Sequence, residues 1–364
     1  MRVLVTGGSG FLGNATIEAI QKLHPDWSVS ILDLQPPLVA RKNVSFLPAD
    51  ITVPQEVQDV FAKANPDAVI HTAGFVPGGQ MRYSNDKKVR DRVFSINYGG
   101  TINVLESAKQ THCRAFVYTS SCTVISDDMS HDYPAMTEEI PTGSASLAYG
   151  ASKAPAEAAV LAANSENMPT CALRPATIIG PGDSFGVVAT MHTCIAKGET
   201  PFIIGDGNNM YDFVFVSNVA DAHVLALENL LAHSTGTASL PSINGTVKAQ
   251  RNRESAAGQA FFISNQEPVY FRDFMLAIWA QFGHVPAWQV RIPAALAWAA
   301  GAAAEFVSWW TGAEATLSRG SVNDAVGIRY SDNAKARRIL GYEPKVRLAE
   351  GVRLACEVSG CSSG

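Results

Sequence analysis

The sequence is poor in charge and lacks the residue spacings that hold metals or cross-link secreted proteins. Only 17% of its 364 residues are charged, the net charge is -5, and no dense run of Lys or Arg occurs. These features exclude the electrostatic signature of a nucleic-acid-binding protein. Six cysteines are present, but they form no CxxC pair and no His-rich cluster. We therefore expect reduced thiols, with neither a zinc site nor a disulfide framework and no bound metal.

A secretion signal is also lacking, because a strand-like run, Arg2–Thr6, starts directly after Met1. We therefore expect a cytoplasmic protein. An apolar stretch at 292–310 approaches the length of a membrane span, but it is mostly alanine and contains Gly301 and Glu305. Its tryptophans leave two alternatives open. The segment is either a helix lying at a lipid interface or a helix packed over the substrate-binding part of the chain.

The sequence does contain a regular alternation of strand-length apolar runs and helical periodicity, which predicts βαβ units and a parallel sheet. We predict an α/β fold, a doubly wound Rossmann sheet with a smaller C-terminal substrate-binding lobe. The predicted Rossmann domain is 1–180 with 211–232 returning to it, and the predicted lobe is 181–210 with 233–364. The predicted strands are Arg2–Thr6, Val29–Asp33, Val44–Pro48, Ala68–Thr72, Ala115–Thr119 and Thr170–Arg174; the predicted helices are Phe11–Leu23, Pro54–Ala64, Val93–Gln110 and Tyr149–Asn164.

A glycine-rich turn, Gly7-Gly8-Ser9-Gly10-Phe11-Leu12-Gly13, follows the first predicted strand and opens the first predicted helix. Its first glycine permits the tight turn, its third lets the backbone approach a pyrophosphate, and its last allows close helix packing, while helix N–H groups face the phosphates. Asp33 ends the second predicted strand about twenty residues later. A carboxylate there accepts hydrogen bonds from ribose hydroxyls and repels a 2′-phosphate, so we predict NAD rather than NADP.

A second motif, Tyr149-Gly150-Ala151-Ser152-Lys153, lies downstream of Thr119-Ser120-Ser121 and supplies a candidate general base. A tyrosine and a lysine four apart share one helix face, so the ammonium is expected to favour the ionised phenol. Without such help, a phenol with a pKa of about 10 removes an alcohol proton poorly near neutral pH. Tyr83 and Lys87 have the same spacing, but no strand ending in Ser or Thr precedes them, and we interpret them as solvated loop residues.

Together these motifs resemble those of the extended short-chain dehydrogenases, and within them the 3β-hydroxysteroid dehydrogenase family. The resemblance covers nearly the whole chain, including His71-Thr72-Ala73, Asn97–Thr101 and the segment 173–183, which resembles the nicotinamide-side loop. Narrower signals are Ile204–Phe213 followed by Val216–Ala226. That pairing is similar to the decarboxylating sterol-4α-carboxylate 3-dehydrogenases, most of all the fungal ones.

The resemblance implies a catalytic set of Ser121, Tyr149 and Lys153. Tyr149 would take the proton from the substrate's 3-hydroxyl, Lys153 would hold the nicotinamide ribose and stabilise the phenolate, and Ser121 would hydrogen-bond the same oxygen. Ser120 and Thr123 remain alternatives to Ser121, because sequence does not define strand register. The implied cofactor contacts are Gly7, Gly10, Phe11, Leu12, Gly13, Asp33, Asp50, Ile51, Ala73, Asn97, Tyr149, Lys153 and Pro175. Asp50 has a second interpretation, as the N-cap of the following helix.

The implied activity is NAD-dependent oxidation of the 3β-hydroxyl of a 4α-carboxy sterol, or of a related triterpenoid or meroterpenoid in fungal secondary metabolism. Decarboxylation would follow, because the product is a β-keto acid whose enolate Tyr149 and Ser121 can stabilise. The alternatives are a 3β-hydroxysteroid dehydrogenase/isomerase, a ketoreductase without decarboxylation, a nucleotide-sugar epimerase and a non-catalytic NAD-sensing protein. The order of the catalytic set weighs against the last. Apolar residues weigh against the epimerase: Ile178, Ile179, Phe185, Val187 and Val188.

The expected partners follow from the same resemblance. The substrate is a small sterol or terpenoid, no nucleic acid is bound, and 292–310 is the candidate peripheral contact with the cytosolic face of the endoplasmic reticulum. A homodimer is a further expectation, through the alanine-rich helix, with packing inside the chain as its alternative. The alanines concerned are Ala151, Ala154, Ala158, Ala159 and Ala162.

Overall fold

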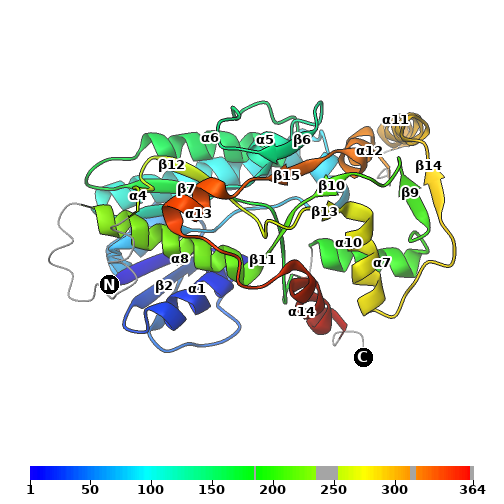
Figure 1. Cartoon of the computed structure of the whole chain (residues 1–364). Coiled ribbons are helices and arrows are strands. Elements are labelled where there is room, and N and C mark those ends of the chain that lie inside the picture. The colour runs from blue at the N-terminus through cyan, green and yellow to red at the C-terminus, as the bar shows by residue number, and fades with distance from the viewer. Residues whose placement is uncertain (184–185, 235–252, 312–316, 361–364) are drawn as a thin grey trace.

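The computed structural model describes residues 1–183, 186–234, 253–311 and 317–360 and contains a seven-stranded parallel sheet (Figure 1). Its strand order, β12-β7-β5-β4-β1-β2-β3, is that of a Rossmann fold and confirms the predicted fold class. The order reverses between β1 and β4, where ligands bind in open α/β sheets. The strands are β1 (Arg2–Thr6), β2 (Ser28–Asp33), β3 (Val44–Pro48), β4 (Ala68–His71), β5 (Phe116–Thr119), β7 (Thr170–Pro175) and β12 (Gln259–Ile263).

Helices cover both faces of this sheet because alternate strand residues are apolar on both sides. Val3 and Val5 pack with the helices α1 and α8, whereas Leu4 between them packs with α2, α4 and α6. In Figure 1, α1 and α8 lie on one side of the sheet and α6 lies on the other. The predicted bounds of α1 and α2 are confirmed at both ends. The helices around the sheet are α1 (Phe11–Leu23), α2 (Pro54–Ala64), α3 (Lys87–Phe94), α4 (Thr101–Gln110), α5 (Thr123–Ser126), α6 (Ala148–Ala162), α8 (Val216–His233) and α13 (Ala334–Leu340), with the 3₁₀ helix η1 (Gly79–Tyr83) and the π-helical segment η2 (Ser95–Gly100).

Some of the remaining elements, among them α7, β11, α10 and α14, build a second core. Phe213 and Phe274 stack at its centre with ring centroids 3.6 Å apart. The remaining elements are β6 (Tyr133–Met136), β8 (Thr177–Ile179), α7 (Val187–Lys197), β9 (Phe202–Ile204), β10 (Met210–Tyr211), β11 (Phe213–Phe215), β13 (Val269–Tyr270), α10 (Phe271–Gln281), β14 (Val290–Ile292), α11 (Ala294–Thr311), α12 (Arg319–Val326), β15 (Arg329–Ser331) and α14 (Leu348–Gly360).

The predicted division into domain and lobe stays a prediction, but one segment of the predicted lobe lies in the central sheet. Strand β12 pairs with β7 along its whole length and forms the edge of the sheet. Helix α13, also from the predicted lobe, contributes to the core that covers this face. The chain therefore returns to the sheet after 233, at a point where sequence alternation did not indicate it.

Helix α11 packs through one face only. Ala297 and Gly301 are buried, and a Cβ built on Gly301 would lie 2.8 Å from the backbone of Ser318, directly before α12. Glu305, one turn further, accepts hydrogen bonds from Arg319. Leu296, Phe306, Val307 and Trp310 on α11 are more than half exposed, so the helix packs against the C-terminal part through one face and leaves its other face open; both alternatives for this segment stay predictions. In the described ranges, no helix is long and apolar enough to cross a membrane.

Candidate active site

The glycine turn closes tightly against the sheet and leaves one side open. Gly7 has φ +68°, and a Cβ built on it would lie 2.7 Å from the Ala73 Cα at the end of β4. A Cβ on Gly13 would lie 2.1 Å from the Gly7 carbonyl oxygen. Gly10 begins α1 and meets only that oxygen, at 3.2 Å. The backbone can therefore be approached at Gly10 and the first N–H groups of α1, as a pyrophosphate requires.

Asp33 lies at the end of β2 beside this turn. Its Oδ2 accepts a hydrogen bond from the Ser9 N–H at 3.0 Å, and its Oδ1 accepts one from the Gln35 N–H at 3.4 Å. The Ser9 hydroxyl is buried and has no hydrogen-bond partner in the part of the chain that the structure describes. An acceptor such as a phosphate oxygen would satisfy this hydroxyl, so the turn fits a dinucleotide.

Four other predicted cofactor residues make contacts within the protein. Phe11 and Leu12 lie in the first turn of α1. They are partly buried and pack against the core that contains Phe213 and Phe274. Asp50 accepts two hydrogen bonds from Thr52, both at 2.8 Å, whereas the N-cap position of α2 belongs to Val53. The N-cap interpretation of Asp50 is therefore wrong. Ile51 is buried, and its side chain contacts Gly100.

Asn97 is fully buried in η2 and links the segment after β4 to α6. Its Oδ1 accepts from the Phe75 N–H at 2.7 Å, and its Nδ2 donates to the Phe75 carbonyl and the Ser152 hydroxyl, both at 3.0 Å. π-helical turns inside α-helices are frequent at functional sites. Pro175, at the end of β7, accepts from the Cys122 N–H at 3.0 Å. Predicted cofactor residues therefore lie at the carboxyl ends of β1, β2, β4 and β7.

Lys153 lies one turn after Tyr149 in α6, but its ammonium does not bond to the phenol. Its Nζ donates to the Thr119 carbonyl at 2.6 Å and lies 4.4 Å from the centre of the Tyr118 ring. Burial lowers the pKa of Lys153 to about 7, although the Glu157 carboxylate opposes this shift. The prediction that Lys153 favours the ionised phenol therefore stays a prediction.

Burial raises the pKa of the Tyr149 phenol well above its usual value, and the charge of Asp127 raises it further. The nearby Ser121 hydroxyl and the Arg82 guanidinium lower it. Ser121 is thus near the phenol, where its predicted role places it. Ser120 instead donates to the buried Glu157 carboxylate at 2.6 Å, so its hydroxyl is engaged away from the phenol.

Thr123, the third candidate hydroxyl, remains open. Its Oγ1 is buried and has no hydrogen-bond partner within the described residues. Its backbone N–H donates to the Ser121 Oγ at 3.2 Å, which orients the Ser121 side chain relative to the Thr123 backbone. The structure therefore brings Ser121, Thr123, Tyr149 and Lys153 together at the carboxyl end of β5.

Sequence reasoning missed an ion cluster beside the phenol. Arg82 donates to Asp127 at 2.8 Å and to Asp324 at 3.2 Å, and Asp324 also accepts from Arg329 and from the Tyr83 hydroxyl. The expectation of a solvated Tyr83 is therefore wrong, because its hydroxyl is bonded at 2.6 Å. The members of this cluster lie up to 242 positions apart in the chain, so no local sequence pattern indicates that they pair.

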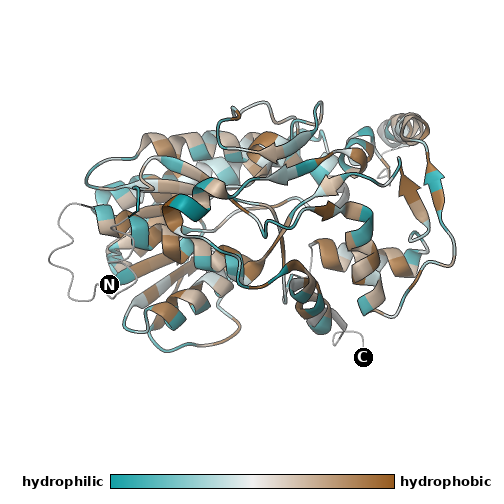
Figure 2. Cartoon of the chain, viewed as in Figure 1, coloured by the Kyte–Doolittle hydropathy of each residue, from teal (hydrophilic) through white to brown (hydrophobic). Residues whose placement is uncertain are grey.

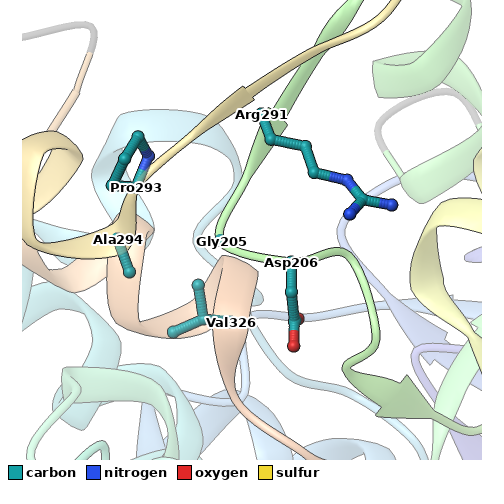
Figure 3. Close-up of a pocket in the computed structure, with 6 residues that line it drawn as sticks. All are labelled: Gly205, Asp206, Arg291, Pro293, Ala294 and Val326. Carbon is teal, nitrogen blue, oxygen red and sulfur yellow. The ribbon is translucent and has the colours of Figure 1, made fainter.

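A cavity of about 560 Å³ lies in the second part of the molecule, away from the predicted site residues. Its walls are the loop after β9, the start of α11 and the end of α12 (Figure 3). Figure 3 shows Arg291 extending away from Pro293 and Ala294. The lining residues are Gly205, Asp206, Arg291, Pro293, Ala294 and Val326.

Comparison with known proteins finds one family model and several relatives that match most or nearly all of the chain. The model of the 3-beta hydroxysteroid dehydrogenase/isomerase family matches residues 4–294. The chain is 34% identical to a decarboxylating sterol-4-alpha-carboxylate 3-dehydrogenase of Schizosaccharomyces pombe, over 97% of this chain and 96% of that one. It is 32% identical to the enzyme of the same description from Candida albicans, over 96% of this chain and 95% of that one.

A solved structure supports the fold. The UDP-glucose 4-epimerase of Thermus thermophilus, in complex with NAD, matches with a TM-score of 0.68 at 23% identity, covering 98% of both chains. At this identity the likeness shows the shared Rossmann architecture only. The epimerase alternative gains no support from it, because many chemistries use one fold.

Proposed function

Because the chain belongs to the 3-beta hydroxysteroid dehydrogenase/isomerase family, we propose that it oxidises the 3β-hydroxyl of a 4α-carboxy sterol, or a related terpenoid, and decarboxylates the product. The observation that carries this proposal is similarity over nearly the full length to dehydrogenases whose names include that reaction. The gathering of Ser121, Tyr149 and Lys153 at the carboxyl edge of the sheet supports it.

The proposed cofactor is NAD. The turn from Gly7 to Gly13 would hold the pyrophosphate, and Asp33 would accept hydrogen bonds from the adenosine ribose and repel a 2′-phosphate. Bound NAD⁺ would accept the hydride that leaves C3. Lys153 would hold the nicotinamide ribose, because its ammonium lies beside Asn97 and Gly74, at the switch point of the sheet.

In the proposed oxidation, Tyr149 removes the proton of the 3-hydroxyl while Ser121 hydrogen-bonds the same oxygen. The phenol must first lose its own proton, and burial opposes this loss. Cationic groups near the phenol therefore contribute to the rate. Lys153, whose pKa is about 7, can exchange a proton with its surroundings near neutral pH.

The proposed decarboxylation needs no further catalytic group. Oxidation at C3 yields a ketone next to C4, so the C4 carboxylate becomes that of a β-keto acid. The bond between C4 and the carboxyl carbon breaks, its electron pair forms the C3–C4 enolate, and carbon dioxide leaves. Tyr149, now protonated, and Ser121 donate hydrogen bonds to the enolate oxygen, which lowers the barrier.

The test uses purified protein, NAD⁺ and a 4α-carboxy-3β-hydroxysterol, with NADH followed by absorbance and the product by mass spectrometry. We expect NADH and a 3-ketone that has lost carbon dioxide. A matched 4α-methyl-3β-hydroxysterol shows whether the carboxylate is required. Tyr149→Phe should bind NAD⁺ with unchanged affinity but lose at least about 10³-fold in kcat. NADH without loss of carbon dioxide would favour the non-decarboxylating alternatives.

We also propose a peripheral membrane contact through the exposed apolar face of α11. Trp310 is 78% exposed and Phe306 is 64% exposed, and Trp288, also exposed, precedes β14. Strand β14 and helix α11 lie together at one end of the molecule (Figures 1 and 2). Trp and Phe side chains favour the membrane interface, and this face would deliver an apolar substrate. The location would be the cytosolic face of the endoplasmic reticulum. Flotation with liposomes should weaken in Phe306→Ser and in Trp310→Ser; equal flotation would contradict the contact.

A homodimer through α6 stays a prediction. Ala158 and Ala162 on this helix are exposed, which leaves them free to meet a second copy, whereas Ala154 is buried in the chain. Sedimentation of the wild type and of Ala158→Glu would test it. A dimer that the glutamate converts to a monomer is the expected result, and a monomeric wild type would contradict it.

A further inference from the structure

The ion cluster beside the phenol holds Asp127 in a buried, two-sided contact. The Asp127 side chain has no exposure, and its Oδ1 accepts from Arg82 Nη2 at 2.8 Å. Its Oδ2 accepts from the Gly150 N–H at 2.9 Å, the residue directly after Tyr149. A carboxylate at the first N–H groups of a helix also interacts favourably with the helix dipole. One buried carboxylate therefore joins Arg82 of η1 to the first turn of α6.

Close contacts hold the first turn of α6 against the segment that carries Thr123 and Asp127. The Ser146 N–H and hydroxyl both donate to the Asp127 carbonyl at 2.9 Å. A Cβ built on Gly150 would lie 2.2 Å from the Thr123 carbonyl oxygen and 2.7 Å from the Asp127 Cβ. Only glycine allows this approach, so the position of Tyr149 depends on the segment that carries Thr123 and Asp127.

Arg82 is in turn anchored from the far part of the chain. Asp324, in α12, accepts from Arg82 Nε at 3.2 Å and from Tyr83 at 2.6 Å, and it also bonds to Arg329. The cluster therefore pairs two guanidinium groups with two carboxylates. Its charges balance when all four members are in place, and removal of any one member alone leaves an unpaired charge.

We propose that Arg82 and Asp127 are positioning residues that act through Tyr149: the pair seats the first turn of α6 beside Ser121 and balances opposite charges at the phenol. This inference rests on the proposed oxidation, in which the Tyr149 phenolate is the base. It assigns a role to two side chains that touch neither the glycine turn nor the Lys153 ammonium.

The charged and titratable groups around the phenol come from several elements. Asp127 and Cys122 flank α5, Arg82 lies on η1, Tyr118 belongs to β5, and Lys153 follows on α6 itself. Among them, Asp127 raises and Arg82 lowers the proton affinity of the phenol. Since oxidation requires the phenolate, the rate rises as pH rises through its pKa.

The sign of the expected shifts follows from these charges. Asp127→Asn removes the negative charge and leaves the guanidinium unbalanced, so the acid limb of kcat should move to lower pH by about one unit. Arg82→Gln should move it by about one unit to higher pH, equivalent to a tenfold lower rate at a fixed pH on that limb. Arg82→Lys retains the charge and should keep the wild-type limb.

The double variant Arg82→Gln/Asp127→Asn keeps the test informative if a single variant folds poorly, because it leaves no unpaired charge. Its acid limb should return toward the wild-type position, although kcat falls because α6 is less well seated. Lys87→Gln and Asp91→Asn break an exposed ion pair of 2.6 Å on α3 and serve as matched controls without a shift. The proposal would be overturned if the acid limb of kcat lay at the same pH in all variants. It would also be overturned if the limb moved in the same direction in both single variants.

A readout that needs no turnover separates this proposal from the proposed function. The ζ-carbon signal of Tyr149, assigned by its absence in Tyr149→Phe, is titrated by NMR in the NAD⁺ complex. The expected order of titration is Asp127→Asn at the lowest pH, then wild type, then Arg82→Gln. Identical titrations would overturn the positioning role. Absence of sterol turnover together with this order would refute the substrate assignment alone.

Discussion

Gly13→Ala is expected to damage both the fold and dinucleotide binding, because the added methyl group has no space. A Cβ at this position would lie 2.1 Å from the Gly7 oxygen and 2.7 Å from the Gly7 carbonyl carbon and the Gly8 Cα. All three are backbone atoms, so no side chain can rotate away. The turn would have to retreat by about 1 Å, at a cost of about 1–3 kcal/mol in unfolding free energy.

The same displacement would misalign the N–H groups that face the pyrophosphate, so the Kd for NAD⁺ should rise at least about tenfold. Calorimetric titration and urea unfolding measure the two effects separately. Gly99→Ala is the matched control, because a Cβ there meets nothing within 4 Å and Gly-to-Ala changes stabilise helices. Gly10→Ala meets only the Gly7 oxygen at 3.2 Å and should weaken NAD⁺ binding with little loss of stability. Wild-type stability and affinity in Gly13→Ala would refute the reasoning.

Three further predictions concern the buried polar groups. The pKa of Lys153 falls to about 7 on folding, so between about pH 7 and 10 the unfolded chain binds more protons and stability rises with pH. Lys153→Met should therefore be more stable than wild type in urea at pH 6, by a few kcal/mol, with the difference shrinking by pH 10; a constant difference would contradict this. Arg174→Met leaves the Glu157 carboxylate buried without its ion pair, and chemical unfolding should show a loss of about 3–5 kcal/mol. Ser121→Ala should lower kcat by about 10²-fold, because an oxyanion donor is lost, while Ser120→Ala stays within a few-fold of wild type; the reverse ranking in steady-state kinetics would exchange their roles.

Local sequence predicted the first half of the sheet well. The bounds of β1, β3, α1 and α2 agree with their predicted ranges, because each apolar run is bounded by a glycine, a proline or a polar turn. The site residues on this part follow from strand order alone. Gly7 and Ala73 end neighbouring parallel strands, so their contact is a consequence of sheet topology.

Local sequence patterns did not predict the contacts between segments that lie far apart in the chain. Strand β12 joins the sheet after a long excursion, and no local pattern tells whether an apolar run of five residues pairs with β7 or lies elsewhere. The prediction of a solvated Tyr83 failed for the same reason, because its partner Asp324 lies 241 positions away. Local sequence also gave no sign that the Lys153 ammonium donates a hydrogen bond to the Thr119 carbonyl.

The sequence by itself determined the Rossmann architecture, the glycine turn with Asp33, and the pairing of Tyr149 with Lys153 on one helix. These features depend on short-range periodicity and on glycine sterics, and the residues that determine them lie close together in the sequence. Only the tertiary structure showed that the Ser120 hydroxyl bonds to Glu157 and which charges surround the phenol. Burial and electrostatic pairing depend on segments that meet in space, so Arg82, Asp127 and Asp324 became recognisable as one cluster only after folding.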